Sequence, residues 1–269
     1  LTELMRTVTG SWRYRYLKLD FLYAASLPGR RHNPRLTPAQ VLASGLELLR
    51  REAGPGVRFL GCGMPIAAGA GRVEAARVSC DVAPRWGQSQ RERLLRSDSN
   101  VETRGAIRNS ILRSGYNKLF WHNDPDCLML RSRNTTLSPV ERETHRMSVL
   151  YAGGSLFVSD DLQSYGEEET ALLKETFAEA EALGKGKTHP VRLFGDDEIY
   201  ALYNDTGFLL LVNLRDEETA IELRLAKYRE LLQPFSSYRP FDGAADHPLE
   251  APRKIQLPAR GFKRIQLSA

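Results

Sequence analysis

The sequence predicts an α/β fold in which about five β/α units are followed by a smaller domain of antiparallel β-strands. Short apolar runs rich in β-branched and aromatic residues alternate with longer segments of helical periodicity, as in β/α units around a parallel sheet. After residue 183 the helical segments give way to short runs with period-two alternation. At 269 residues and 42% hydrophobic content, the chain is long enough to bury a large core.

The five predicted strands are short apolar runs, and each of them ends in a polar cluster. The helices between them have recognisable start signals: Thr37-Pro38 opens one, Ser138-Pro139 opens another, and an acidic run beginning at Glu167 opens the last. The predicted strands cover residues 14–19, 57–60, 75–79, 118–121 and 155–158, and the predicted helices cover residues 39–52, 104–114, 140–151 and 167–183.

A change in texture after the last predicted helix indicates a domain boundary. The sequence GKGK at residues 184–187 has the composition of a linker, and the segments beyond it are shorter and more β-like. We therefore predict two domains, residues 1–183 and residues 184–269, the second being an antiparallel β-sandwich. Its strands are predicted at residues 198–203, 207–213, 219–225, 253–257 and 263–267.

Composition argues against several classes of function. The net charge of +5 comes from 38 basic and 33 acidic residues that are interspersed along the chain, which does not favour nucleic-acid binding. No apolar run is long enough to span a membrane. Three cysteines are too few and odd in number for a secreted disulfide framework, so we expect a reducing, cytoplasmic location.

Carboxylates follow four of the five predicted strands. In a β/α barrel the carboxyl ends of the strands form one mouth, where the reacting groups lie. Isolated Asp and Asn residues in such loops are commonly helix caps, and the cluster at residues 159–161 is expected to cap the last helix. The strand ends carry Lys18 and Asp20, then Gly61, Cys62 and Gly63, then Arg77 and Asp81, then Asn123, Asp124 and Asp126, then Ser159, Asp160 and Asp161.

Repetition of acidic strand ends favours either a metal site or acid/base and nucleophilic chemistry on a polar substrate. Lys18 lies two residues before Asp20 on the same face of its strand, where its charge would keep Asp20 ionised. A magnesium or calcium site could be built from Asp20, Asp81 and Asp126. Lys18 and Arg77 would then lie beside the cation and repel it, which argues against such a site.

The cysteines raise a zinc alternative, since Cys62, Cys80 and Cys127 all lie at strand ends. No pair of them has CxxC spacing, which argues against a zinc site, and we predict no metal.

Five motifs, taken in order over about residues 14–162, resemble the α-galactosidases of glycoside hydrolase family 36, whose clan includes family 27. The β-rich tail is similar to the C-terminal domain of those enzymes. The resemblance implies that the five units are strands 4 to 8 of a (β/α)8 TIM barrel. The motifs are YLKLDFLYAA, GCGMPI, RVSCDVAPRW, NDPDCLMLR and GGSLFVSDDL.

The resemblance implies a retaining glycosidase with no organic cofactor and assigns its two carboxylates. Lysine two residues before aspartate marks the family's nucleophile, which Lys18 and Asp20 match. Arginine four residues before a second aspartate marks the general acid/base, which Arg77 and Asp81 match. Such a mechanism needs one ionised and one protonated carboxyl group about 5–5.5 Å apart.

The substrate contacts also follow from the resemblance. Lys18 and Arg77 would contact sugar hydroxyls, and Cys62 with Gly63 would shape the galactose pocket. Trp121 either stacks on the sugar or packs in the core, and Asp126 either contacts the substrate or fixes its loop.

The protonation states that the mechanism needs are expected from the neighbouring residues. The charge of Lys18 favours the charged form of Asp20. The apolar neighbours Val82, Ala83 and Trp86 would favour the protonated form of Asp81.

The chain departs from the family pattern because strands 1 to 3 of the barrel are absent, together with a tryptophan and two aspartates that bind galactose there. We therefore expect an N-terminally truncated enzyme that is poorly soluble or inactive alone and whose full-length form is a possible homo-oligomer. The expected substrate is an α-galactoside. Alternatives are an α-N-acetylgalactosaminide specificity, transglycosylation, or a catalytically silent carbohydrate-binding relic.

Overall fold

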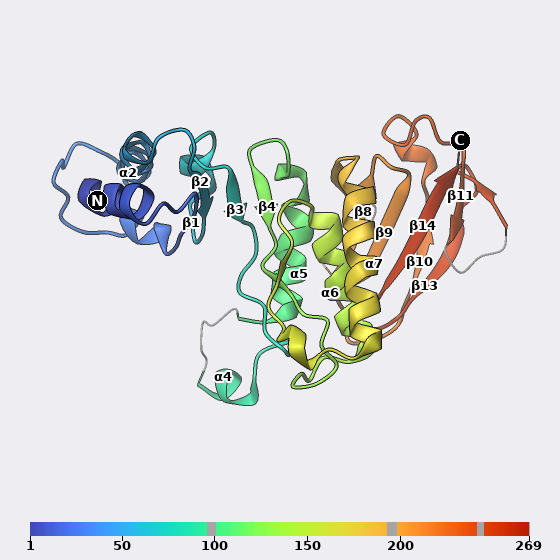
Figure 1. Cartoon of the computed structure of the whole chain (residues 1–269). Coiled ribbons are helices and arrows are strands. Elements are labelled where there is room, and N and C mark those ends of the chain that lie inside the picture. Colours follow the sequence, from blue (N-terminus) through green and yellow to red (C-terminus); the bar gives the residue numbers. More distant parts are fainter. Residues whose placement is uncertain (96–100, 193–197, 241–244, 269) are drawn as a thin grey trace. The chain divides into compact units, whose positions relative to one another are not determined.

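The computed structural model describes residues 1–95, 101–192, 198–240 and 245–268 (Figure 1). The chain forms two compact units. The first unit comprises Leu1–Val78 and Tyr116–Asp124, and the second comprises Ser79–Gly115 and Pro125–Ala269. These units do not divide at residues 183 and 184, where the sequence predicts a domain boundary. The two-domain division stays a prediction.

The first unit is built on a parallel sheet with strand order β1-β2-β3-β4. Lys18 of β1 aligns with Leu60 of β2, and Arg77 of β3 aligns with Asp124 of β4. The elements of this unit are α1 (Thr2–Arg6), η1 (Thr7–Ser11), β1 (Tyr16–Leu19), η2 (Leu22–Ser26), α2 (Pro38–Ala53), β2 (Arg58–Gly61), α3 (Ile66–Gly69), β3 (Ala75–Arg77) and β4 (His122–Asp124).

Helix α2 begins where its sequence predicts. The Thr37 hydroxyl accepts a hydrogen bond from the Gln40 N–H while the Gln40 side chain accepts one from the Thr37 N–H, so both exposed donors are satisfied. Three leucines of α2, spaced four and then three residues apart, lie on one face of the helix and face the sheet. They join the core of the first unit, whose buried residues are Met5, Leu42, Leu46, Leu49, Val57, Phe59, Ala68, Val73, Ala76 and Trp121.

Two predictions about the strands are wrong. Of residues 118–121, predicted as the fourth strand, 118–120 form a turn and Trp121 forms an isolated bridge with Asn117; β4 begins at the next residue, His122. The predicted five-stranded sheet is not formed either: β6 (Phe157–Val158) pairs in parallel with the unpredicted β5 (Cys127–Leu128) in a separate small sheet of the second unit. The described residues therefore contain parallel β/α units but no closed barrel.

The predicted helices of the second unit are all present, with ends within about two residues of those predicted. Helix α6 has the same reciprocal cap as α2, formed here by Ser138 and Glu141. The helical elements of this unit are α4 (Gln90–Leu94), α5 (Thr103–Leu112), η3 (Ser114–Tyr116, ending in the first unit), α6 (Pro139–Ala152), η4 (Leu162–Ser164), α7 (Glu167–Gly184) and η5 (Ala226–Tyr228).

Two antiparallel sheets complete the second unit, with orders β12-β11-β14-β9-β8-β7 and β10-β13. Strands β7, β11 and β12 were not predicted from the sequence. The strands are β7 (Thr188–Val191), β8 (Ile199–Asn204), β9 (Phe208–Asn213), β10 (Thr219–Leu223), β11 (Ser237–Pro240), β12 (His247–Pro248), β13 (Arg253–Leu257) and β14 (Phe262–Ser268).

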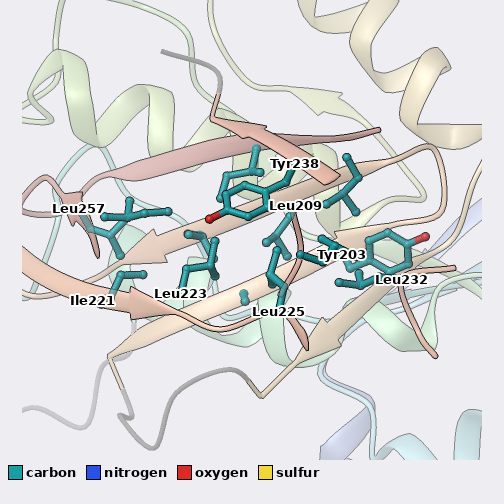
Figure 2. Packing of buried hydrophobic residues seen from close by; sticks show 14 of the residues in the cluster. Tyr203, Leu209, Ile221, Leu223, Leu225, Leu232, Tyr238 and Leu257 are labelled. Carbon is teal, nitrogen blue, oxygen red and sulfur yellow. The ribbon is translucent and has the colours of Figure 1, made fainter. Parts of the chain in front are cut away.

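The larger sheet is buried on both faces at β8 and β9. Tyr203 and Leu209 enter the core between the two sheets, the sandwich core, to which β10, β11 and β13 also contribute labelled side chains in Figure 2. The sandwich core consists of Ile199, Ala201, Tyr203, Leu209, Leu211, Ile221, Leu223, Leu225, Leu232, Tyr238, Leu249, Ile255, Leu257, Ile265 and Leu267.

Neighbouring residues of the same strands point the other way because side chains alternate along a strand. Leu202 and Leu210 pack against helices α5, α6 and α7, which cover that face of the sheet (Figure 1). The helices and the β-sheet therefore share a core, which is the physical reason that they belong to one compact unit. This helix-facing core contains Trp86, Ile107, Ile111, Met129, Leu137, Met147, Leu150, Tyr151, Leu183, Leu202, Leu210, Val212 and Leu214.

Candidate active site

Asp20 directly follows the carboxyl end of β1, and its side chain is 45% exposed. Nζ of Lys18 lies 3.8 Å from Oδ2 of Asp20, so the two side chains share a face as their spacing predicts. The backbone N–H of Phe21 donates to Oδ1 at 2.8 Å. An exposed ion pair adds only about 0–1 kcal/mol to stability. The Lys18–Asp20 pair instead matters because it orients a charged carboxylate at the end of β1.

Cys62 follows β2 and is held beside Asp20 by backbone hydrogen bonds. Its N–H donates to the carbonyl of Leu19 at 2.8 Å, and its carbonyl accepts from the N–H of Leu22 at 3.2 Å. The Cys62 side chain is buried, and its thiol, as a hydrogen-bond donor, favours the ionised form of Asp20 and so lowers the pKa of that carboxyl group. Burial, together with this contact, raises the pKa of the Cys62 thiol to about 11, so it stays a protonated donor.

Gly63 completes this loop with a φ of +60°, a conformation that a side chain would strain. A Cβ at this position would also lie 3.1 Å from Cδ1 of Tyr23. The N–H of Tyr23 donates to the carbonyl of Gly63 at 2.7 Å. The loops after β1 and β2 are thus joined by hydrogen bonds, which fixes the Cys62 thiol relative to Asp20.

The pKa of Asp20 is held below its ordinary value chiefly by the hydrogen bond from Cys62. The N–H of Phe21 and the charges of Lys18 and Arg77 act in the same direction, whereas partial burial opposes them. Each of these groups favours the ionised carboxylate. Asp20 therefore has the charge state that a nucleophile requires.

Replacing Cys62 with alanine is expected to raise the pKa of Asp20, because the largest favourable contact to the ionised form is removed. Cys62→Ser, which keeps a donor, should restore most of the shift. The measurement is a carboxyl ¹³C NMR titration of both variants. Because the folded pKa is depressed, the associated stability is present above the unfolded pKa and is lost as the pH falls through the folded one. An Asp20 pKa equal in wild type and Cys62→Ala contradicts the prediction.

Arg77 lies on β3 in a buried ion pair. Its Nε donates to Oδ2 of Asp124 at 3.0 Å, and the side chains are 8% and 1% exposed. The pair follows from strand register, since the two residues are neighbours across β3 and β4. Asp124 thus orients the guanidinium that contributes to the field at Asp20. The sequence did not predict this pairing of Asp124 with Arg77.

Trp121 is buried at 5% exposure in the core of the first unit. Its indole N–H donates to Oδ1 of Asn123 at 3.1 Å, and its ring packs edge-on against Tyr116. This position is the one expected from the packing alternative. A contact between Trp121 and a sugar stays a prediction.

Asp81 and Asp126 belong to the second unit, whereas Asp20, Lys18 and Arg77 belong to the first. Asp126 is buried, has a φ of +76°, and accepts a hydrogen bond from the N–H of Val82 at 2.8 Å. The carboxylate therefore anchors the backbone directly after Asp81. This contact is the loop-fixing role that the sequence left open for Asp126.

The expected apolar enclosure of Asp81 is not formed by its sequence neighbours. Asp81 is exposed, whereas Ala83 and Trp86 are buried, the latter in the helix-facing core. A run of apolar residues after a strand enters the core rather than surrounding the preceding carboxylate, because burial of their apolar surface dominates.

The acidic cluster at residues 159–161 does not cap the last helix as expected. The buried Asp160 carboxylate accepts from the N–H groups of Leu130 and Arg131 and from the Tyr165 hydroxyl. Asp161 caps the short turn η4, and α7 begins after Gly166. Asp160, which follows β6, thus binds the backbone that follows β5. The spacing of these residues in the sequence does not predict this contact.

The described residues contain no group of three or more His, Cys, Asp or Glu side chains that could hold a metal ion. All three cysteines carry free thiols. No helix in the described ranges has the length and apolar character needed to cross a bilayer.

Comparison with known proteins finds no family model that matches the chain. Among solved structures, an α-galactosidase from Thermus thermophilus in complex with stachyose is 32% identical at a TM-score of 0.56. This match covers 65% of the present chain and 36% of that enzyme. The chain thus spans little more than a third of that relative.

Other solved structures are similar over nearly the whole chain. α-Galactosidase I from Mortierella vinacea is 13% identical at a TM-score of 0.70, covering 97% of this chain and 69% of that one. A family 27 β-L-arabinopyranosidase from Geobacillus stearothermophilus is 14% identical at 0.66, covering 100% and 60%. These two likenesses concern the fold. The three solved structures named here are two α-galactosidases and a family 27 β-L-arabinopyranosidase.

Proposed function

We propose that this chain carries the two catalytic carboxylates of a retaining glycosidase that acts on terminal α-galactosides. The proposal depends chiefly on the environment of Asp20. This carboxylate lies at the end of a parallel strand, and Cys62, Lys18 and Arg77 favour its ionised form. The 32% identity to an α-galactosidase that was solved with stachyose supports the choice of substrate.

In the proposed reaction, a carboxylate oxygen of Asp20 attacks the anomeric carbon while the bond to the leaving oxygen breaks. Asp81 gives its proton to that oxygen. Asp81 then takes a proton from water, whose oxygen attacks the same carbon and releases Asp20. Two displacements return the anomeric configuration to that of the substrate.

The test is covalent trapping with an activated 2-fluoro galactoside followed by peptide mass mapping. We would treat both the 269-residue chain and a chimera in which the N-terminal part of the Thermus thermophilus enzyme precedes it. The proposal expects the label on Asp20 in the chimera and no turnover by the chain alone. A label on another carboxylate, or none on an active chimera, would refute the assignment.

Replacing Asp81 with alanine in the chimera is expected to slow galactosides with poor leaving groups by about 10²–10⁴-fold and aryl galactosides with good leaving groups far less. The reason is that only a poor leaving group needs a proton as the bond breaks. Steady-state kcat/KM across an aryl galactoside series measures the difference. Equal losses across the series would exclude Asp81 as the acid.

A further inference from the structure

The second unit contains a cavity of about 920 Å³ whose lining includes neither Asp20 nor Asp81. Its walls come from residues 85–90, from the first turns of α5 and α6, and from loops of the β-sheet that carry Glu198 and Arg260. The volume lies within the range of about 300–1,000 Å³ that is usual for small-molecule sites. The cavity therefore has the size of a ligand site.

Ion pairs hold the charged side chains of the wall in place. Arg104 contacts Glu198 at 2.7 Å, and Arg260 contacts Glu141 at 2.6 Å and Asp216 at 2.9 Å. The Glu141 side chain is only 4% exposed. A guanidinium engaged on one edge keeps further N–H groups, and a carboxylate keeps further lone pairs. The wall is thus preorganised and can still form hydrogen bonds.

Both signs of charge line the cavity, and this mixture restricts the ligand. Five arginines are interspersed with four carboxylates. An anion would meet the carboxylates and a cation would meet the guanidinium groups, each with like-charge repulsion. A hydroxyl group donates and accepts at once, so a ligand with many hydroxyls can satisfy both kinds of neighbour. The lining therefore favours a neutral, polyhydroxylated ligand.

Trp86 adds an aromatic side chain to this wall. The guanidinium of Arg260 lies 5.9 Å from the centre of its ring. The buried indole N–H of Trp86 has no hydrogen-bond partner among the described residues. A sugar ring has hydroxyl groups that donate and accept hydrogen bonds, and it has apolar C–H faces. The arginines supply donors, the carboxylates supply acceptors, and the indole supplies an apolar surface for those faces.

We propose that this cavity is a saccharide-binding site that does not use the catalytic carboxylates. It takes neutral oligosaccharides through the Arg104–Glu198 and Arg260–Glu141 pairs. The proposal goes beyond the proposed function and depends on it only for the choice of probe, stachyose.

The test fills the cavity without removing a polar group. Gly87 lines it, and a Cβ at this position would meet only Oε2 of Glu102, at 3.8 Å. Gly87→Trp is therefore expected to fold and to weaken stachyose binding by at least about tenfold. The control is Gly56→Trp in the first unit, where a Cβ has no neighbour within 4 Å. Binding to the 269-residue chain is measured by saturation-transfer NMR and calorimetry, with circular dichroism to check folding.

A second pair of variants separates this site from the catalytic one. Asp20→Asn should bind stachyose as wild type does, whereas Arg104→Met should bind it less tightly. Binding that is lost in Asp20→Asn but unchanged in Gly87→Trp would overturn the proposal while leaving the proposed function intact. No stachyose binding by the folded wild type, or binding of inorganic phosphate in its place, would also overturn it.

Discussion

Replacing Asp20 with asparagine is expected to lower kcat/KM of the chimera by at least about 10⁴-fold and to remove the covalent label, because the proposed nucleophile is lost. The amide is uncharged and cannot form the glycosyl ester. Asparagine nearly preserves the size of the side chain, so the loss reports chemistry rather than folding. Aryl galactoside kinetics and intact-protein mass measure both effects.

The matched control for Asp20→Asn is Asp161→Asn, an exposed carboxylate that caps the turn η4. Its activity should stay within about twofold of the wild type, in line with the small effects of surface changes. A further variant, Asp20→Gly, should recover turnover when azide is added and give a product of inverted configuration, because azide attacks the anomeric carbon in place of the carboxylate. Retained labelling in Asp20→Asn would show that another residue is the nucleophile.

Replacing Asp124 with leucine is expected to lower the free energy of unfolding of the first unit by about 3–5 kcal/mol. The change leaves the Arg77 guanidinium, 8% exposed, without the carboxylate that pairs with it. Removing one member of a buried ion pair costs far more than the pair itself contributes to stability. Urea unfolding of the chain, followed by tryptophan fluorescence, measures the loss.

Two controls make the Asp124 prediction specific. The double variant Arg77→Met, Asp124→Leu should regain most of the stability, because neither charge is then buried. Glu222→Ala removes an exposed pair with Arg224, in which the side chains of Glu222 and Arg224 are 46% and 65% exposed, and should change stability by no more than about 0.5 kcal/mol. A stable Asp124→Leu protein, or a double variant as unstable as the single one, would contradict the argument.

Part of the candidate site could be predicted from the sequence because it depends on neighbours along one strand. Lys18 and Asp20 share a face through the two-residue period of a strand, and the structure places their charged atoms 3.8 Å apart. The other contacts to Asp20 required two strands to meet. Cys62 reaches the carboxylate only because β2 lies beside β1 in a particular register.

The sequence by itself determined the elements whose signals are local. Helices α2 and α6 begin at Thr37 and Ser138 because the residues three positions later close reciprocal hydrogen bonds with these caps. The similarity of its ordered motifs to α-galactosidases was likewise readable from the chain.

Only the tertiary structure decided which residues far apart in the chain act together. It paired Arg77 with Asp124, gave Asp126 the N–H of Val82, and put Asp160 between two strand ends. It also assigned helices α5–α7 to the same unit as the β-sheet. The physical reason is that burial of apolar surface and satisfaction of buried polar groups depend on what the rest of the chain brings near, which no local pattern encodes.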